Sequence, residues 1–288
     1  MPELPEVETM RRGVQAIVGS RIVDVRRPKC AKRPILVAPR IDSLCRRTCG
    51  CTITAVDRIG KRVVVRLDSG DALVFEPRMT GLVLLAAPPT PEHLRLQVKL
   101  AGGDIDELLF WDRRGLGSVR LVSPSEFAVR YGSGDIGPDA LMVTADELRA
   151  RLKHSRRAIK VALLDQKALA GIGNLYASEM LHVAGIHPAK PCDQLRPAQW
   201  RKLHAAMHEV LEMAIRYEGS TLGDGTYRNA LNQQGSYQNH HRVYNRAGDV
   251  CPGCGKATIE RIVQTQRSTF FCPRCQRAPQ QRRRSPSS

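Results

Sequence analysis

Hydrophobic and polar residues alternate in short runs over roughly the first 120 residues, the spacing of β-strands that bury one face. A short helix is expected before them, over residues 4–18, because Val7, Met10, Val14 and Ile17 recur at helical spacing. Polar turns that contain glycine separate the strand-like runs. The predicted strands cover residues 21–26, 52–58, 62–67, 72–75, 82–85, 94–100, 107–111 and 118–121. This pattern predicts an antiparallel sandwich or barrel.

The pattern changes around residues 132–138, and helical spacing dominates beyond them. Helices are predicted over residues 144–153, 156–165, 174–184 and 197–216. Gly171 and Gly173 interrupt this region, and Asn174 stands where the next helix would be capped. Backbone N–H groups and an amide in such a turn suit a DNA phosphate, and Arg156 and Lys160 just upstream strengthen this interpretation. The alternative is a plain hairpin of two helices.

Composition narrows the class of protein. The 288 residues are 42% hydrophobic, which indicates a globular chain of about two domains. Lys and Arg number 45 against 28 Asp and Glu, giving a formal charge of +17 that favours a polyanionic partner. Nucleic acid fits better than a membrane, because the basic residues are spread along the chain. No apolar run reaches the roughly 18–20 residues that span a bilayer, and a secretory leader is not recognisable.

The nine cysteines fall into two groups. The first has the spacing C-x2-C-x17-C-x2-C, which is typical of a zinc site with four thiolate ligands, Cys251, Cys254, Cys272 and Cys275. Two disulfides are the alternative, which the missing secretory leader disfavours. The second group is interpreted as small apolar residues or incidental thiols: Cys30, Cys45, Cys49, Cys51 and Cys192.

The chain starts Met-Pro-Glu-Leu-Pro-Glu-Val, and this stretch carries candidate chemistry. Removal of Met1 would leave Pro2 with a free secondary amine, which titrates near about 8 and can attack an electrophilic carbon. Glu3 beside it is a candidate proton donor or acceptor. Taken alone, the two prolines would favour a solvated leader.

These motifs, with others along the chain, resemble the bacterial formamidopyrimidine-DNA glycosylase family. The segments that carry the resemblance are 2–7, 60–61, 78–81, 112–117, 136–138, 166–179, 185–188 and 266–272. The resemblance implies an α+β multidomain fold. It comprises an N-terminal antiparallel β-sandwich with flanking helices, then a helical helix–two-turn–helix domain with a zinc finger. The expected domains are 1–135 (catalytic sandwich), 136–240 (helix–two-turn–helix), 241–277 (zinc finger with four cysteine ligands) and 278–288 (a disordered basic tail).

The resemblance implies a bifunctional DNA glycosylase and apurinic/apyrimidinic lyase of base excision repair. It would excise oxidised purines such as 8-oxoguanine and formamidopyrimidines through a Schiff base on Pro2, then cut the strand by β,δ-elimination. Glu3 is then the acid, Glu6 supports Pro2 or a water, Lys61 contacts the lesion phosphate, and Arg267 grips phosphates and assists δ-elimination. One zinc ion is structural, since four thiolates leave no open position.

Three residues match those that the family inserts into the duplex when the damaged base is flipped out: Met79, Arg114 and Leu116. The sequence departs from the family here, because Leu116 replaces an aromatic wedge and Gly115 replaces a second basic residue. One residue is also added between the zinc pairs. Further DNA contacts are implied for His93, Arg156, Lys160 and Asn174. Residues 221–238 match the loop that closes over the extruded base, and their composition predicts a mobile lid.

The expected partner is damaged double-stranded DNA, bound by a monomer in the cytoplasm at the nucleoid, with no membrane and no nucleotide cofactor. Two alternatives remain open. One is the sister branch that excises oxidised pyrimidines and resembles endonuclease VIII, although that branch typically carries glycine where Leu4 stands. The other is a non-catalytic nucleic-acid-binding zinc protein, against which Pro2, Glu3 and Lys61 argue.

Overall fold

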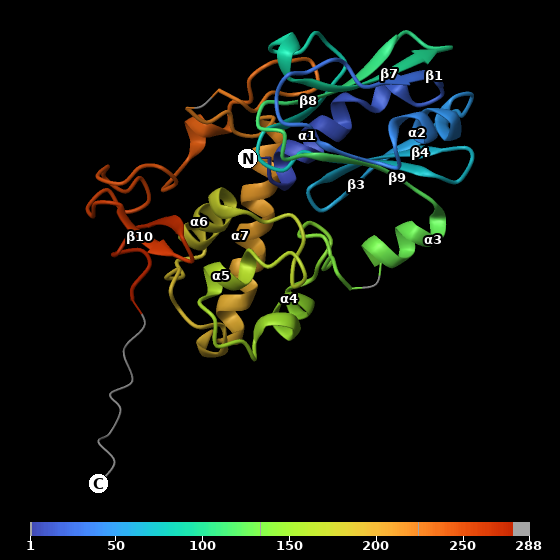
Figure 1. Cartoon of the computed structure of the whole chain (residues 1–288). Helices are drawn as coiled ribbons and strands as arrows, with labels where there is room; N and C mark the ends of the chain where they lie inside the picture. Colours follow the sequence, from blue (N-terminus) through green and yellow to red (C-terminus); the bar gives the residue numbers. More distant parts are fainter. Residues whose placement is uncertain (1, 133, 224, 279–288) are drawn as a thin grey trace. The chain divides into compact units, whose positions relative to one another are not determined.

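The computed structural model describes residues 2–132, 134–223 and 225–278 (Figure 1). The chain forms two compact units. The first contains Met1–Asp139 and Leu211–His240, and the second contains Ala140–Val210 and His241–Ser288. The domain boundaries expected from the sequence stay predictions, and residues 279–288 of the expected basic tail lie outside the described residues.

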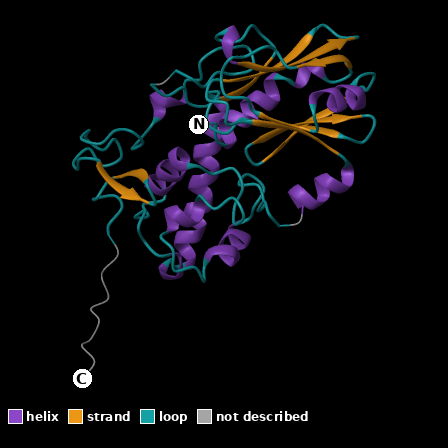
Figure 2. Cartoon of the chain, viewed as in Figure 1, coloured by secondary structure: helices purple, strands orange, loops and turns teal. Residues whose placement is uncertain are grey.

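Two β-sheets form the body of the first unit (Figure 2). One sheet is antiparallel, with the strand order β1 (Arg21–Arg26), β7 (Leu94–Ala101), β8 (Glu107–Asp112), β6 (Gly81–Leu84). The other has the order β2 (Leu36–Ala38), β9 (Ser118–Val122), β5 (Ala72–Glu76), β4 (Arg62–Leu67), β3 (Ile53–Ile59). Within it only β2 and β9 pair in parallel. The antiparallel sandwich expected from the alternating pattern is confirmed.

Helix α1 (Leu4–Gly13) packs between the two sheets and contacts β3 and β4 of one and β6 of the other. Its apolar positions Val7 and Met10, with Val14 just after the helix, are fully buried in the core shared by both sheets. The predicted helix over 4–18 is interrupted after Gly13, and a 3-10 turn covers Gln15–Ile17. A Cβ at Gly13 would lie 2.5 Å from the Cβ of Ala230, so close packing explains the glycine.

Three short elements of this unit have no clear pattern in the sequence. Helices α2 (Ile41–Thr48) and α3 (Pro124–Phe127) and the three-residue strand β2 were not predicted. Short elements carry too few residues to establish a period. Helix α3 covers the outer face of the five-stranded sheet, where Phe127 packs with Val64, Val74 and Val122.

The second unit is helical and ends in a hairpin. It contains α4 (Ala145–Leu152), α5 (Ile159–Leu163), α6 (Asn174–Val183), the larger part of α7 (Pro197–Arg216), and strands β10 (Glu260–Gln264) and β11 (Arg267–Phe271). The helix predicted from residue 156 begins only at Ile159, because Ala158 bridges to Pro191 in extended conformation. In the part of the chain that the structure describes, no helix has the length and apolar character needed to cross a membrane.

Candidate active site and metal centre

The N-terminal candidates are ordered by the start of α1. Glu3 is the N-cap residue, and its backbone N–H donates to Oε2 of Glu6 at 2.8 Å while its own side chain accepts from the backbone of Glu6. This reciprocal capping box satisfies the first donors of the helix. Pro2 is buried, and Glu3 is 3% exposed. The capping box therefore holds the Glu3 carboxylate beside the residue that carries the candidate amine.

Glu6 also ties α1 to the segment that follows α7. Its Oε1 accepts a hydrogen bond from the backbone N–H of Ser220 at 2.9 Å. Gly219 allows this approach, since its φ is +78° and a Cβ there would lie 2.8 Å from the Glu6 carboxylate. Tyr227 Oη donates to the carbonyl of Glu218 at 2.9 Å, and burial raises the pKa of Tyr227 well above its usual value. The phenol thus stays a neutral donor.

Within residues 221–238, the predicted mobile lid, three hydrogen bonds involve Thr221. The backbone N–H of Thr221 donates to Oε1 of Gln238 at 2.9 Å, and Thr221 Oγ1 donates to the carbonyl of Tyr227 at 2.9 Å. The N–H of Gly235 donates to Thr221 Oγ1 at 3.0 Å. An opening of this segment as a unit would instead break its bonds to the rest of the first unit, such as the one that Asn232 Nδ2 donates to the carbonyl of Ala87 at 3.0 Å.

Lys61 stands in the two-residue turn between β3 and β4, the strands against which α1 packs. Arg58 Nη1 donates to the carbonyl of Gly60 at 3.0 Å and holds this turn. Arg58 is in turn paired with Asp139 through two hydrogen bonds of 2.5 and 3.1 Å, and its Nε donates to Glu8 at 3.0 Å. The partly buried guanidinium therefore positions the backbone on which Lys61 sits.

The three predicted insertion residues come from two neighbouring loops of the first unit. Strands β6 and β8 pair with Gly81 opposite Asp112, so the loop before β6 and the loop after β8 emerge side by side. Met79 belongs to the former loop, and Arg114 and Leu116 to the latter. The register thus brings together residues that are far apart in sequence.

Asp112 joins these two loops and is fully buried. Its Oδ1 accepts from Thr80 Oγ1 at 2.5 Å and from the N–H of Arg114 at 3.2 Å, and its Oδ2 accepts from the N–H of Gly117 at 2.7 Å. The Arg114 side chain is exposed, and Leu116 is half-buried. Both orientations leave the side chains available to a duplex.

His93 ends a 3-10 turn, Pro91–His93, in front of β7. Its ring lies 5.6 Å from that of Trp111 in an edge-on arrangement, and Trp111 Nε1 donates to the carbonyl of Thr90 at 2.7 Å. The predicted DNA contact of His93 stays a prediction.

In the second unit, Lys160 and Asn174 form a buried junction with the hairpin. Lys160 is 1% exposed, and its Nζ donates to Asn174 Oδ1 at 2.6 Å, to Thr269 Oγ1 at 2.6 Å and to the carbonyl of Ser268 at 3.2 Å. Asn174 Nδ2 donates to the same carbonyl at 2.9 Å. Asn174 is the first residue of α6 and not its cap, which is Gly173.

Lys160 is buried and its ammonium is engaged by three acceptors, and its expected contact with DNA stays a prediction. A surface phosphate would have to displace acceptors that already take the donors of Nζ. Arg156 is exposed, as is Arg267 at the start of β11, directly after the tight turn that joins the hairpin strands. These two arginines keep the exposure that a phosphate contact requires.

Glu179 on α6 holds the segment that leads to the zinc cysteines. It is fully buried, and its carboxylate accepts from the backbone N–H groups of Arg242, Val243 and Tyr244 at 2.7–2.9 Å. Burial raises the pKa of Glu179, and the three donors offset part of that rise.

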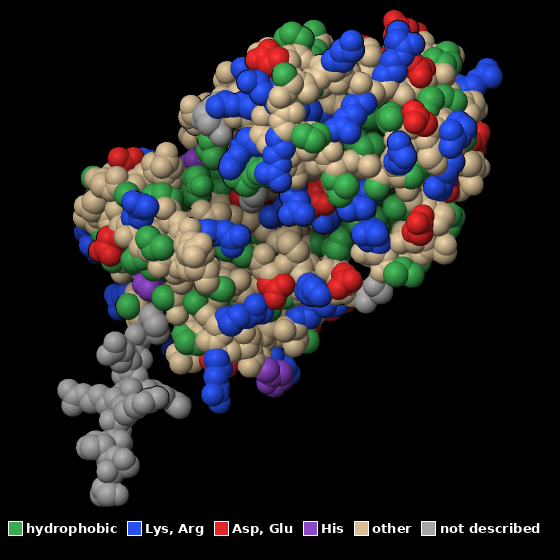
Figure 3. Space-filling view, in the orientation of Figure 1, with side chains coloured by type: hydrophobic (Ala, Val, Ile, Leu, Met, Phe, Trp, Pro, Cys, Tyr) green, Lys and Arg blue, Asp and Glu red, His purple; other side chains and the backbone are tan. Residues whose placement is uncertain are grey.

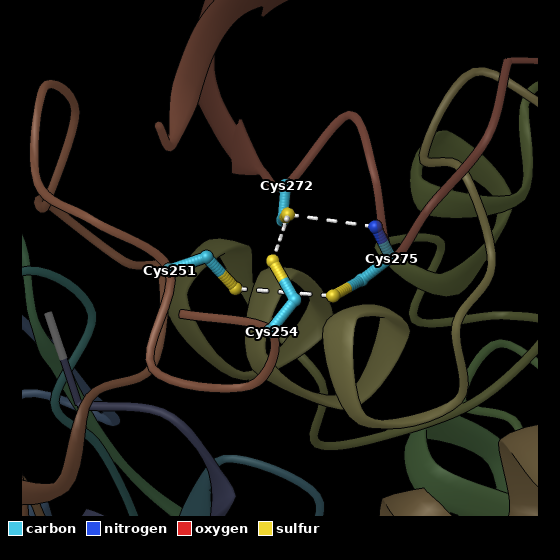
Figure 4. Close-up of side chains that lie close together, drawn as sticks. All are labelled: Cys251, Cys254, Cys272 and Cys275. Atoms are coloured by element: carbon cyan, nitrogen blue, oxygen red, sulfur yellow. Dashed lines mark hydrogen bonds between the residues drawn. The ribbon is translucent and has the colours of Figure 1, made fainter. Parts of the chain in front are cut away.

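The four cysteines meet in one cluster (Figure 4). The Sγ atoms of Cys251 and Cys275 are 3.9 Å apart, those of Cys254 and Cys272 are 3.8 Å apart, and all four lie within 4.8 Å of one another. Four thiolates around one zinc at about 2.3 Å stand about 3.8 Å from each other. Backbone hydrogen bonds from Ala257 and Lys256 lower the pKa of Cys254 to about 6, whereas burial raises the pKa values of Cys251 and Cys275, so of these three only Cys254 is a thiolate without the help of a metal ion. The residues fit a structural zinc.

The remaining thiols take no part in this cluster. The Sγ atoms of Cys45 and Cys49 lie 3.2 Å apart at the end of α2. Burial is the larger cause that raises the pKa of Cys49 to about 12, and the hydrogen bond with Cys45 is the second. Burial likewise raises the pKa of Cys192 to about 11. Such thiols stay protonated at neutral pH, as expected for incidental cysteines.

Comparison with known proteins covers nearly the whole chain. Family models match three segments: the formamidopyrimidine-DNA glycosylase N-terminal domain at residues 1–119, its H2TH domain at 136–225, and the zinc finger found in FPG and IleRS at 248–278. A formamidopyrimidine-DNA glycosylase of Chloroflexus aurantiacus is 40% identical over 98% of this chain and 99% of its own length. The chain belongs to the formamidopyrimidine-DNA glycosylase family.

Solved structures agree with this assignment. A mutant of Lactococcus lactis Fpg in complex with a Fapy-dG containing DNA superposes with a TM-score of 0.85 at 34% identity, covering 96% of this chain and 100% of that one. MutM (Fpg) of Thermus thermophilus gives a TM-score of 0.82 at 36% identity, with 96% and 98% covered. As a family member the chain is a DNA glycosylase of base excision repair with the lyase activity typical of the family. The fold and the zinc finger are confirmed.

Sequence reasoning missed the residues that position this site: Arg58, Asp112, Glu179 and the buried role of Lys160. Asp112 carried a signal, because an acidic residue directly follows a buried apolar strand and precedes a loop rich in arginine and glycine. Arg58 and Glu179 have no such signal in the sequence, since the residues to which they bond are far away along the chain.

Proposed function

We propose that this family member excises oxidised purines, 8-oxoguanine and formamidopyrimidines, from double-stranded DNA, using the nitrogen of Pro2 after removal of Met1. The observation that carries the proposal is the start of α1, where the capping box holds Glu3 next to a buried Pro2. Relatives support the substrate class, because the Lactococcus lactis protein was solved with Fapy-dG and with abasic-site DNA. The site of action would be the cytoplasm, at the nucleoid.

In this mechanism the Pro2 nitrogen forms a bond to C1′ of the deoxyribose while the bond between C1′ and the base breaks. Glu3 protonates the ring oxygen, the sugar opens, and C1′ and Pro2 are joined as an iminium ion. The iminium acidifies the C2′ proton, whose removal expels the 3′ phosphate by β-elimination. A second elimination expels the 5′ phosphate and leaves the sugar remnant on Pro2 until water releases it.

The remaining residues have supporting roles in the proposal. Lys61 pairs with the phosphate of the lesion from the turn that Arg58 holds, and Arg267 pairs with phosphates from the exposed tip of the hairpin. Glu6 positions the first turn of α1 through its bonds to Glu3 and Ser220. The space that the flipped base vacates is filled by Met79, Arg114 and Leu116.

Arg156 and Asn174 complete the proposed DNA contacts in the second unit, and His93 completes those in the first. Asn174 is half-buried, and its Oδ1 and Nδ2 are engaged by Lys160 and Ser268. Lys160 then acts as a positioning residue, which orients the Asn174 amide. Zinc, when bound, organises the hairpin that carries Arg267 and supplies no reactive position.

Borohydride trapping tests the nucleophile. Protein whose mass establishes loss of Met1 should form a covalent adduct with a duplex that contains 8-oxoguanine opposite cytosine, and peptide mapping should place the sugar on Pro2. Pro2→Gly should slow base release by at least about a hundredfold, since a flexible primary amine replaces the secondary amine that the ring holds in place, while duplex affinity stays within about threefold. An adduct at another residue, or full turnover by Pro2→Gly, would refute the assignment.

The same assay separates the alternatives. Adducts formed with oxidised thymine but not with 8-oxoguanine would point to the branch that resembles endonuclease VIII. Failure to trap any damaged or abasic duplex would leave a nucleic-acid-binding protein without catalysis.

A further inference from the structure

A strongly basic segment lies between β1 and β2 of the first unit. Residues 27–33, here called the basic segment, contain the exposed cations Arg27, Lys29, Lys32 and Arg33 and no acidic residue. Among the residues that the structure describes, none of these four side chains forms an ion pair. Figure 3 shows that Lys and Arg side chains are numerous on the visible face of the molecule. What distinguishes this segment is therefore its attachment to the rest of the unit.

Arg95 connects the basic segment to the start of the loop after β8, which carries Arg114 and Leu116 and is here called the insertion loop. Its side chain is 2% exposed, its Nη1 donates to Cys30 Sγ at 2.7 Å, and its Nε donates to the carbonyl of Asp112 at 2.8 Å. The Cys30 thiol in turn donates to the carbonyl of Glu92 at 3.0 Å. One buried guanidinium thus links the segment to the residue that organises the loops of Met79 and Arg114.

Gly115 provides a second contact between the segment and the insertion loop. It has φ +64°, and a Cβ at this position would lie 2.4 Å from the carbonyl oxygen of Arg33. A side chain at residue 115 would therefore collide with the backbone of the basic segment as well as strain its own backbone. The segment packs directly against the loop, which explains why a glycine stands there.

The segment also surrounds a hollow suited to an oxyanion. The hollow measures about 250 Å³ and is lined by three cations, Arg27, Lys32 and Arg95, with Cys30 and the prolines at 28 and 34. Nη2 of Arg95 is buried, and no hydrogen-bond partner for it lies in the described part of the chain. A phosphate in the hollow would lie against a lining that carries three positively charged side chains.

We infer that the basic segment is an additional DNA-binding surface that holds a backbone phosphate next to the inserted side chains, with Arg95 as its positioning residue. This inference rests on the proposed function. Insertion between bases distorts the duplex locally, so a phosphate clamp attached to the insertion loop would strengthen binding where the distortion occurs.

Salt dependence of binding tests the inference. Lys32→Ala/Arg33→Ala should weaken binding to a duplex with a tetrahydrofuran abasic-site analogue by about tenfold at about 0.1 M salt. It should also reduce the slope of log K against log salt by about 1–2, because each lost phosphate contact contributes about 0.9. Arg46→Ala/Arg130→Ala removes the same charge from exposed positions elsewhere in the unit and should leave the slope unchanged. Equal slopes for the two double variants would overturn the inference.

Substitution of Cys30 tests the link through Arg95 without removing a positive charge. Cys30→Ala should raise the Kd for the same duplex about threefold, whereas Cys30→Ser, which keeps a hydrogen-bond acceptor, should restore wild-type binding. Binding is compared well below the unfolding midpoints of both variants, because Cys30→Ala leaves Nη1 of the buried Arg95 without this acceptor and should unfold at a lower temperature than Cys30→Ser. Identical affinities of the Ala and Ser variants would contradict the positioning role.

Two further arms separate the possible explanations. Calorimetry with inorganic phosphate alone shows whether the hollow binds the free anion. Suppose that the protein binds phosphate saturably, that Lys32→Ala/Arg33→Ala abolishes this binding, and that the slope of log K for DNA against log salt is unchanged in the double variant. The hollow would then be a site for free phosphate, and the DNA contact would be overturned.

Borohydride trapping by the same double variant at saturating protein should match wild type. Trapping by wild type with unchanged DNA slopes would refute this inference alone, whereas no trapping by either protein would refute the proposed function.

Discussion

Two buried charged side chains, Asp112 and Lys160, form hydrogen bonds with segments that are distant in the sequence. A buried charge is costly unless its bonds are complete, so such residues hold one geometry firmly. Their substitution should disturb recognition of the lesion more than the chemistry on the sugar.

Asp112→Asn tests this distinction. The amide NH2 cannot accept hydrogen bonds as a carboxylate oxygen does, so either Gly117 or the pair of Thr80 and Arg114 loses its acceptor, at a cost of about 1–3 kcal/mol. We expect kcat/KM for 8-oxoguanine excision to fall about tenfold to a hundredfold. Cleavage of a preformed abasic site, which has no base to extrude, should fall much less.

The control for this measurement is Asp104→Asn, because Asp104 is exposed in the turn between β7 and β8. It should leave both rates unchanged. Equal losses on the two substrates in Asp112→Asn would show that Asp112 supports the fold in general and not the insertion loops.

At the level of elements, α1 is held in the sandwich by an ionic cluster in addition to its apolar face. Glu8 on α1 accepts hydrogen bonds from Arg11 and Arg12 of the same helix and from Arg58 of β3. Burial raises the pKa of Glu8, but the hydrogen bonds from Arg11, Arg12 and Arg58 outweigh it, so the pKa lies below its usual 4.5. The cluster connects the helix that Glu3 caps with the strand that precedes Lys61.

A pH dependence of stability follows. Because the pKa of Glu8 is lower in the folded state, its contribution is fully present above about 4.5 and is lost as the pH falls through the folded-state value. Calorimetry should find Glu8→Gln less stable than wild type at about pH 6, with the difference shrinking towards about pH 3. The exposed Glu92→Gln is the matched control. A difference that stays constant with pH would contradict the proposed ionic role.

The elements also show how far the sequence alone leads. Three segments were predicted to the residue, Arg21–Arg26, Arg62–Leu67 and Pro197–Arg216, because glycine or proline lies close to both ends of each. Strand β2 could not be found, since three residues pair in parallel with a distant strand. The zinc cysteines were evident from spacing. The burial of Lys160 was not, because its three acceptors come from α6 and the hairpin.

At the level of the whole molecule, each unit combines distant parts of the chain. Residues 211–240 return to the N-terminal unit, where the N–H of Leu85 donates to the carbonyl of Ala230 at 2.9 Å. The second unit likewise joins α6 to the zinc segment through Glu179. The residues proposed for the site thus come from both units.

Loss of zinc should affect only one of them. Cys272→Ser removes a ligand of the four-thiolate cluster, so zinc content should fall and the hairpin that carries Arg267 should lose its order. We expect DNA affinity to fall at least about tenfold, while the unfolding transition of the first unit is retained. Cys51→Ser, in the first unit and outside the cluster, is the control. Full DNA binding by zinc-free protein would contradict the role of the finger.

The pairing of Gly81 with Asp112 has a consequence for how this enzyme can diversify. The spacing of the three side chains proposed to enter the double helix depends on this strand alignment, because the loops that carry them leave the sheet at the two paired residues. A single residue inserted into β8 would place the Asp112 side chain on the opposite face of the sheet. Met79 would then no longer lie beside Arg114 and Leu116. Relatives should therefore vary the chemistry of these side chains freely while preserving the lengths of β6 and β8.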